Sequence, residues 1–114
     1  MMIMAEKSAD MKGKAVKLKG LVEYQKGSVV SRTVIDKKTG TVTLFAFDEG
    51  EGLSEHTAPY DAMVVDLEGI VDMKIAGASN HLEEGDVIIM PANKPHALKA
   101  LTKFKMMLVM IKAT

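Results

Sequence analysis

Short strand-like segments separated by turn residues follow one another from residue 28 to residue 111, and they limit the possible folds more than any other feature. Residues 28–36 and 41–48 are rich in β-branched and aromatic side chains, which favour strands. The later segments of this kind are 62–69, 70–77, 87–91, 96–101 and 104–111. Short strands at regular spacing with turn signals between them predict an all-β sandwich or barrel.

Glycine and proline mark the turns between these segments. Residues 37–40 suit a hairpin loop in which Gly40 takes the position that needs a positive φ. Residues 83–86 predict a second turn, and residues 91–95 predict a rigid loop because their two prolines fix φ and cannot donate to a ladder. At the start of the chain, residues 3–12 suit a helical turn or a fraying end.

The length of 114 residues corresponds to one domain, and a hydrophobic content of 47% indicates a globular chain. We expect a single barrel domain over residues 20–114. Residues 1–19 are expected to form an N-terminal segment that is partly ordered or joins a dimer.

The last segment predicts an interface. In residues 104–111, apolar side chains alternate onto both faces of the strand, so both faces should be covered. The barrel interior covers one face. The other needs the N-terminal segment, a second sheet or a second subunit, and we favour a homodimer because uncovered apolar strand surface promotes aggregation.

Charge and composition exclude several classes of function. Lys plus Arg and Asp plus Glu are 15 each, so net charge gives no reason to expect a nucleic acid or membrane partner. No apolar stretch approaches the roughly 18–20 residues of a membrane span. The N-terminus does not resemble a signal peptide, and we expect a cytoplasmic protein. The absence of cysteine excludes disulfides, thiolate zinc sites and cysteine nucleophiles.

The charges are unevenly distributed along the chain. Residues 1–40 carry nine basic and four acidic side chains. Residues 41–90 carry one basic and eleven acidic side chains, and residues 91–114 carry five basic and no acidic ones. We expect basic and acidic strands to become neighbours and neutralise each other. The alternative is an acidic rim around the site that attracts cations, formed by the acidic run of the middle block. That run is Asp48, Glu49, Glu51 and Glu55.

Two stretches carry glycine, proline or histidine at characteristic spacings. In the first, Gly50 precedes His56 by six positions, and the stretch closes at Gly69. In the second, Gly85 precedes Pro91 by six positions, and His96 follows five positions later. These six positions resemble the paired motifs of the cupin superfamily, whose members are small jelly-roll β-barrels. The resemblance covers roughly residues 28–111 and implies the same fold here.

The resemblance is incomplete at the positions that bind metal. In metal-binding cupins, two histidines and a glutamate of the first motif join the histidine of the second around one divalent metal. The second histidine position is Ala58 here and the glutamate position is Ala62, while His56 and His96 are kept. In the second motif, Asn93 stands for a glycine and Ala100 for an asparagine.

A metal site built on His56 and His96 would need a further ligand, because catalytic sites usually have three protein ligands and water. Asp61 and Tyr60 are the candidates beside the missing glutamate. Imidazole with carboxylate or phenolate would suit iron, manganese, zinc, nickel or copper, and a thioether would favour copper. The ten methionines are otherwise expected to fill gaps in the core.

Three functions remain open. The first is a barrel that binds or senses a small molecule, with or without metal, since alanines at ligand positions leave apolar space. The second is a metalloenzyme, an oxygenase or isomerase of cupin type, which uses the two-histidine site. The third is a metal-free isomerase or lyase with His96 as base and Tyr60 as acid.

His81 is expected on the surface or in a turn. The expected pocket is lined by methionines and by His56, Ala58, Tyr60, Ala62, His96 and Leu98.

Overall fold

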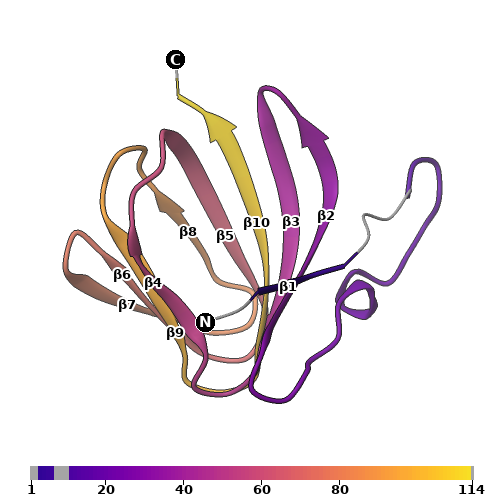
Figure 1. The fold of residues 1–114 in the computed structure, drawn as a ribbon, viewed down its shortest axis with the longest axis horizontal. Coiled ribbons are helices and arrows are strands. Elements are labelled where there is room, and N and C mark those ends of the chain that lie inside the picture. The colour runs from indigo at the N-terminus through magenta and orange to yellow at the C-terminus, as the bar shows by residue number, and fades with distance from the viewer. Residues whose placement is uncertain (1–2, 7–10, 114) are drawn as a thin grey trace.

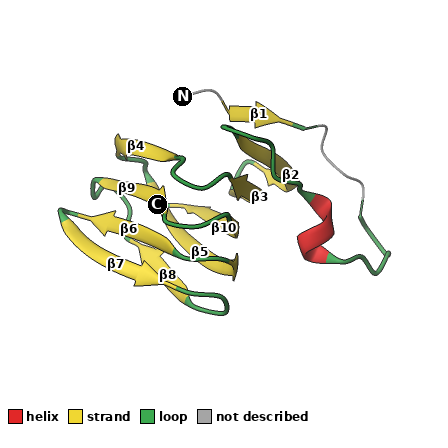
Figure 2. Ribbon diagram, turned by 90° about the horizontal axis from the view of Figure 1, so that it is seen from below, coloured by secondary structure: helices red, strands yellow, loops and turns green. Residues whose placement is uncertain are grey.

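The computed structural model describes residues 3–6 and 11–113, and it confirms the all-β prediction. Ten strands form a six-stranded sheet in the order β1-β2-β3-β10-β5-β8 and a four-stranded sheet in the order β4-β9-β6-β7, which curve around a common interior (Figures 1 and 2). The strands are β1 (Ile3–Ala5), β2 (Val29–Lys37), β3 (Gly40–Phe47), β4 (Gly52–His56), β5 (Tyr60–Glu68), β6 (Val71–Ile75), β7 (Ala78–Leu82), β8 (Val87–Met90), β9 (His96–Ala100) and β10 (Phe104–Lys112). Among the described residues, no helix is long and apolar enough to cross a membrane.

Strand β10 organises the core, because it pairs antiparallel with β3 on one side and β5 on the other. Its inward side chains join apolar residues of both sheets in one buried cluster. Phe104 and Met106 are almost fully buried there, together with Val71 and Met73 from the facing sheet. This shared cluster holds the two sheets together.

The N-terminal segment does not form the helical turn expected in residues 3–12. Ile3–Ala5 is a strand that pairs parallel with β2, so the open edge of β2 takes precedence over local helix propensity. Residues 7–10 lie outside the described residues. A 3-10 helix, η1 (Leu18–Leu21), lies beyond the edge of the large sheet, on the side away from the four-stranded sheet (Figure 2).

The basic N-terminal segment meets the acidic middle of the chain. Lys19 Nζ lies 3.8 Å from a carboxylate oxygen of Glu68 and 3.6 Å from one of Glu84. Lys105 Nζ donates to the Lys19 carbonyl oxygen at 2.7 Å and also lies over the ring of Tyr24. These contacts agree with the expectation that oppositely charged parts of the chain become neighbours.

The outward face of β10 is only partly covered. A second apolar cluster, centred on Val22, Val30 and Leu44, packs against Met107. Beyond it a row of apolar side chains crosses five strands in register, and the side chains at its two ends are 52% and 60% exposed. The row consists of Ile35, Val42, Val109, Met63 and Ile89. The N-terminal segment therefore accounts for only one part of this face, and the homodimer stays a prediction.

Gly40 does not have the role predicted for it. Its φ is not positive, and it is the first residue of β3. A Cβ at this position would lie 2.3 Å from the carbonyl oxygen of Met110, so close backbone approach requires the glycine. Gly69, Gly77 and Gly85 do take positive φ values, and Gly85 lies in the turn predicted over residues 83–86.

A buried carboxyl group lies at the inner surface of β5. Asp66 is 1% exposed, and neither of its oxygens has a well-formed hydrogen bond. Its pKa is raised from 3.8 to about 7, and burial is the largest cause. The Glu68 backbone N–H opposes this rise in pKa, whereas the nearby carboxylates of Asp86, Glu84 and Glu83 contribute to it.

This pKa shift predicts that Asp66 costs stability at neutral and higher pH. Between pH 3.8 and about 7 the unfolded protein has Asp66 ionised while the folded protein keeps it protonated. Raising the pH through this window therefore favours unfolding, and the loss is complete above about pH 7. We expect Asp66→Asn to be about 1–3 kcal/mol more stable than the parent at pH 8, with a smaller difference at pH 4.5. Urea unfolding at the two pH values measures this, and an equal difference at both would contradict it.

Candidate functional site

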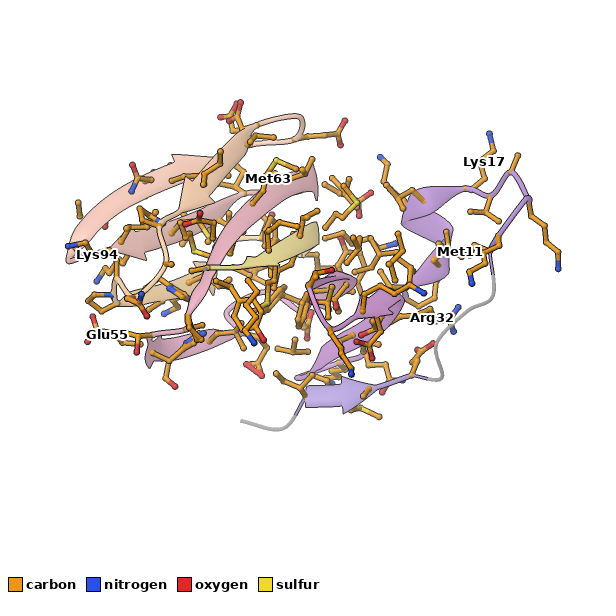
Figure 3. All side chains as sticks on the ribbon, turned by 90° about the horizontal axis from the view of Figure 1, so that it is seen from above. Met11, Lys17, Arg32, Glu55, Met63 and Lys94 are labelled. Atoms are coloured by element: carbon orange, nitrogen blue, oxygen red, sulfur yellow. The ribbon has the colours of Figure 1, made fainter. Side chains whose placement is uncertain are left out.

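His56 and His96 meet at one end of the four-stranded sheet. His56 ends β4, His96 begins β9, and the two residues are cross-strand partners. Their Nε2 atoms lie 3.0 Å apart, with the rings edge to face and their centroids 4.3 Å apart. Figure 3 shows Glu55 and Lys94, which lie one and two positions before these histidines in the chain, at the same end of the molecule. The pairing that the two motifs predicted therefore exists.

The backbone fixes the orientation of both imidazole rings. His56 Nδ1 lies 2.8 Å from the carbonyl oxygen of Ser54, and His96 Nδ1 lies 3.1 Å from that of Lys94. A carbonyl oxygen only accepts hydrogen bonds, so each Nδ1 carries the proton and donates it. Each neutral ring then has its lone pair on Nε2, the atom that lies 3.0 Å from Nε2 of the other ring.

The surroundings of His96 favour its neutral form. Partial burial lowers the pKa of His96, and the neighbouring His56 lowers it further, whereas the hydrogen bond to the Lys94 carbonyl raises it. At neutral pH His96 therefore presents an unprotonated Nε2. Two Nε2 lone pairs this close need an electron-pair acceptor between them, either a proton or a cation.

A small cavity opens on this pair. Its volume is about 40 Å³, space for about one to three water molecules. Apart from the histidines its lining is apolar. The lining residues are Leu53, His56, Met73, Met90, His96, Ala97, Leu98, Met106 and Leu108.

The cavity includes only some of the side chains expected around the site. His56, His96 and Leu98 line it together with methionines, whereas Ala58, Tyr60 and Ala62 are not among its lining residues. Ala58 lies in the loop before β5, where its carbonyl oxygen accepts from the Asn93 N–H at 2.8 Å. Tyr60 begins β5, pairs with Lys112 and is half-buried.

Among the residues that the structure describes, no third histidine or acidic ligand joins the pair. Asp61 is exposed, and one of its oxygens accepts from the Ala92 N–H at 2.9 Å. Within residues 3–6 and 11–113, no group of three His, Cys, Asp or Glu side chains is placed to hold a metal ion. His81 is exposed on β7 and lies 3.9 Å from Asp72, away from the pair.

The acidic run before His56 does not surround the site as expected. Asp48 is fixed at the opposite end of β4, where its carboxylate accepts from the N–H groups of Gly27 and Glu49, and these bonds lower its pKa. Gly50 donates to the carbonyl oxygen of Ala100 in the same region. The β4–β9 pairing separates this loop from His56 by the length of the strand, so only Glu55 is close to the pair.

Comparisons with known proteins agree with this fold. The profile of the Cupin domain family matches residues 43–112. The chain is similar to a conserved protein of unknown function from Streptococcus pyogenes, with 34% identity over 90% of each chain and a TM-score of 0.85. Comparison with curated proteins gives no match.

Two further solved structures extend this likeness. A cupin superfamily protein from Desulfitobacterium hafniense has 26% identity, covers 89% of this chain and 93% of its own, and gives a TM-score of 0.84. A Cupin 2 conserved barrel domain protein from Leptotrichia buccalis has 36% identity over 82% of this chain, with a TM-score of 0.80. This chain spans 46% of the length of that second protein.

Proposed function

The chain belongs to the cupin superfamily, and from that membership we propose that it binds a small ligand, a metal ion, through the Nε2 atoms of His56 and His96. One observation carries the proposal. The two Nε2 atoms face each other at 3.0 Å while both Nδ1 atoms donate to backbone carbonyls. Such backbone anchoring of the second ring nitrogen is typical of histidines that bind metal.

The spacing of the two nitrogens suits a shared ion. Imidazole nitrogens lie about 2.0–2.1 Å from a bound transition metal, so two such ligands are about 3.0 Å apart at a right angle and about 3.4 Å apart at the tetrahedral angle. The full cupin ligand set does not fit, because Ala58 and Ala62 have no donor atom where a histidine and a glutamate would be needed. The proposal is therefore a reduced site with two protein imidazoles.

The small cavity favours binding of an ion over binding of a larger organic molecule. Drug-sized ligands occupy pockets of about 300–1,000 Å³, whereas this cavity measures about 40 Å³. The lack of a third histidine or acidic ligand among the described residues also favours binding or sensing over catalysis by a metal centre. A metal-free proton shared between the two Nε2 atoms is the competing explanation of the 3.0 Å contact.

Metal titration of matched histidine variants tests the proposal. We expect the parent to bind one transition metal ion per chain, and His56→Ala or His96→Ala to weaken binding by about 100-fold or more, because each removes half of the imidazole ligands. His81→Ala is the control, since His81 is an exposed histidine outside the site, and it should bind like the parent. Calorimetry with zinc, nickel, cobalt and copper salts, with circular dichroism to verify folding, measures these effects.

Two outcomes would contradict the proposal. If the parent binds none of these ions, the shared proton explains the histidine pair. If His81→Ala weakens binding as much as His56→Ala, the ion binds elsewhere on the surface.

A further inference from the structure

The cavity beside the two histidines contains a second class of donor atom. Met73, Met90 and Met106 line it together with His56 and His96. They come from β6, β8 and β10, so strands of both sheets bring thioethers to one small space. All three methionines are at most 4% exposed.

The position of the missing glutamate is flanked by two of the chain's methionines. Ala62 on β5 is the cross-strand partner of Met90 on β8 and of Met110 on β10. Direct cross-strand partners have Cβ atoms about 4.5–5.5 Å apart and share a face of the sheet. The place where the resemblance puts a carboxylate is thus an alanine whose two cross-strand partners are methionines, and one of these, Met90, lines the cavity.

We propose that the ligand of this site is copper(I), held by His56 and His96 together with thioethers of the cavity, Met90 and Met106 foremost. The inference rests on the proposed metal binding and adds the identity of the ion. Thioether is a soft donor that selects copper(I), whereas carboxylate and carbonyl oxygens suit harder ions. Replacement of the glutamate by methyl and thioether groups therefore changes the preference of the site from divalent ions towards cuprous ion.

The size and surroundings of the cavity also suit this ion. A space of about 40 Å³ leaves no room for a large hydration shell. An apolar wall of leucine and methionine disfavours a divalent charge that no carboxylate compensates, and it disfavours a single positive charge less. Copper supplied as the cuprous ion binds without any change of oxidation state.

The other role for these methionines is packing. Unbranched, polarisable side chains fill irregular core gaps, and ten methionines in this chain make that role general. Packing and ligation make different predictions for Met→Leu replacement, because leucine keeps the apolar volume and removes the sulfur donor.

Competition for cuprous ion distinguishes the two roles. We would titrate the full chain anaerobically, under reductant, against a chromogenic cuprous chelator, and in parallel titrate zinc. We expect the Met90→Leu and Met106→Leu variants each to lose about tenfold or more in cuprous affinity with little change in zinc affinity. Met63→Leu is the matched control, because Met63 lies on β5 in the outward apolar row and does not line the cavity (Figure 3). It should leave both affinities unchanged.

X-ray absorption spectroscopy at the copper edge gives an independent readout. The parent should show sulfur as well as nitrogen scatterers around copper, and the double variant Met90→Leu, Met106→Leu should lose sulfur scattering. Unchanged cuprous affinity in both leucine variants, or a copper shell of nitrogen and oxygen alone, would overturn the copper(I) assignment. In that case zinc binding that still depends on His56 would leave the proposed metal binding intact. If the parent binds neither cuprous ion nor zinc, both proposals are wrong.

Discussion

Gly69→Ala should remove a large fraction of the protein's free energy of unfolding. Gly69 has φ +88°, and a Cβ there would lie 1.9 Å from the carbonyl oxygen of Lys103 and 2.8 Å from the hydroxyl oxygen of Thr102. The turn after β5 is fixed against the turn before β10, since Ile70 N–H donates to the Thr102 hydroxyl at 2.9 Å. Left-handed strain and overpacking together should cost on the order of 3–5 kcal/mol. Denaturant unfolding measures this cost.

A second glycine separates the two causes. Gly77 has nearly the same φ, +85°, but nothing lies within 4 Å of a Cβ built there. Gly77→Ala should therefore lose only the conformational part, about 1 kcal/mol or slightly more. If the two variants lose equal stability, close packing of the β5 turn against the β10 turn is not what requires glycine at position 69.

The core strands could be predicted from the sequence because their side chains show burial directly. Residues 41–48, 62–69 and 104–111 have runs of β-branched, aromatic or alternating apolar side chains, and the observed β3, β5 and β10 begin and end within two residues of these limits. The turn at Gly85 was equally readable, because positive φ strongly favours glycine.

The edge strands could not be predicted in this way. β4 and β7 are short and largely polar, and most of their residues are exposed or half-buried. Each lies at an edge of the four-stranded sheet and pairs with a single neighbour. Backbone hydrogen bonds, not side-chain pattern, define such strands, so neither an apolar period nor β-branched enrichment reveals them.

The candidate site was predictable from the sequence only in part. The resemblance of the two motifs to those of the cupin superfamily was sufficient to identify His56 and His96 as partners, and the β4–β9 pairing places them opposite each other. The sequence does not reveal which of ten methionines share the cavity, since Met73, Met90 and Met106 come from three separate strands. It also does not predict the acidic loop at the far end of β4, which depends on the length of that strand.

Phe104→Ala is expected to be as damaging as Gly69→Ala, through the core. Phe104 is fully buried and is the cross-strand partner of Phe47, with ring centroids 5.5 Å apart. Phe47 in turn stacks on Phe45 at 5.8 Å. Removing a buried phenylalanine ring leaves a cavity and typically costs about 3–5 kcal/mol. A domain of this size has about 5–15 kcal/mol in total, so the midpoint of urea unfolding should fall by a large fraction while the slope stays constant.

The rings of Phe104, Phe47 and Phe45 form a row, and its half-buried end, Phe45, provides the comparison. Phe45 packs against the same cluster but is only partly buried, so Phe45→Ala should cost clearly less than Phe104→Ala. The ordering follows from position, since Phe104 begins β10 between the two sheets and both sheets lose contacts when its ring is removed. Equal losses in the two variants would indicate that stacking along the row, and not burial between the sheets, determines the contribution of each ring.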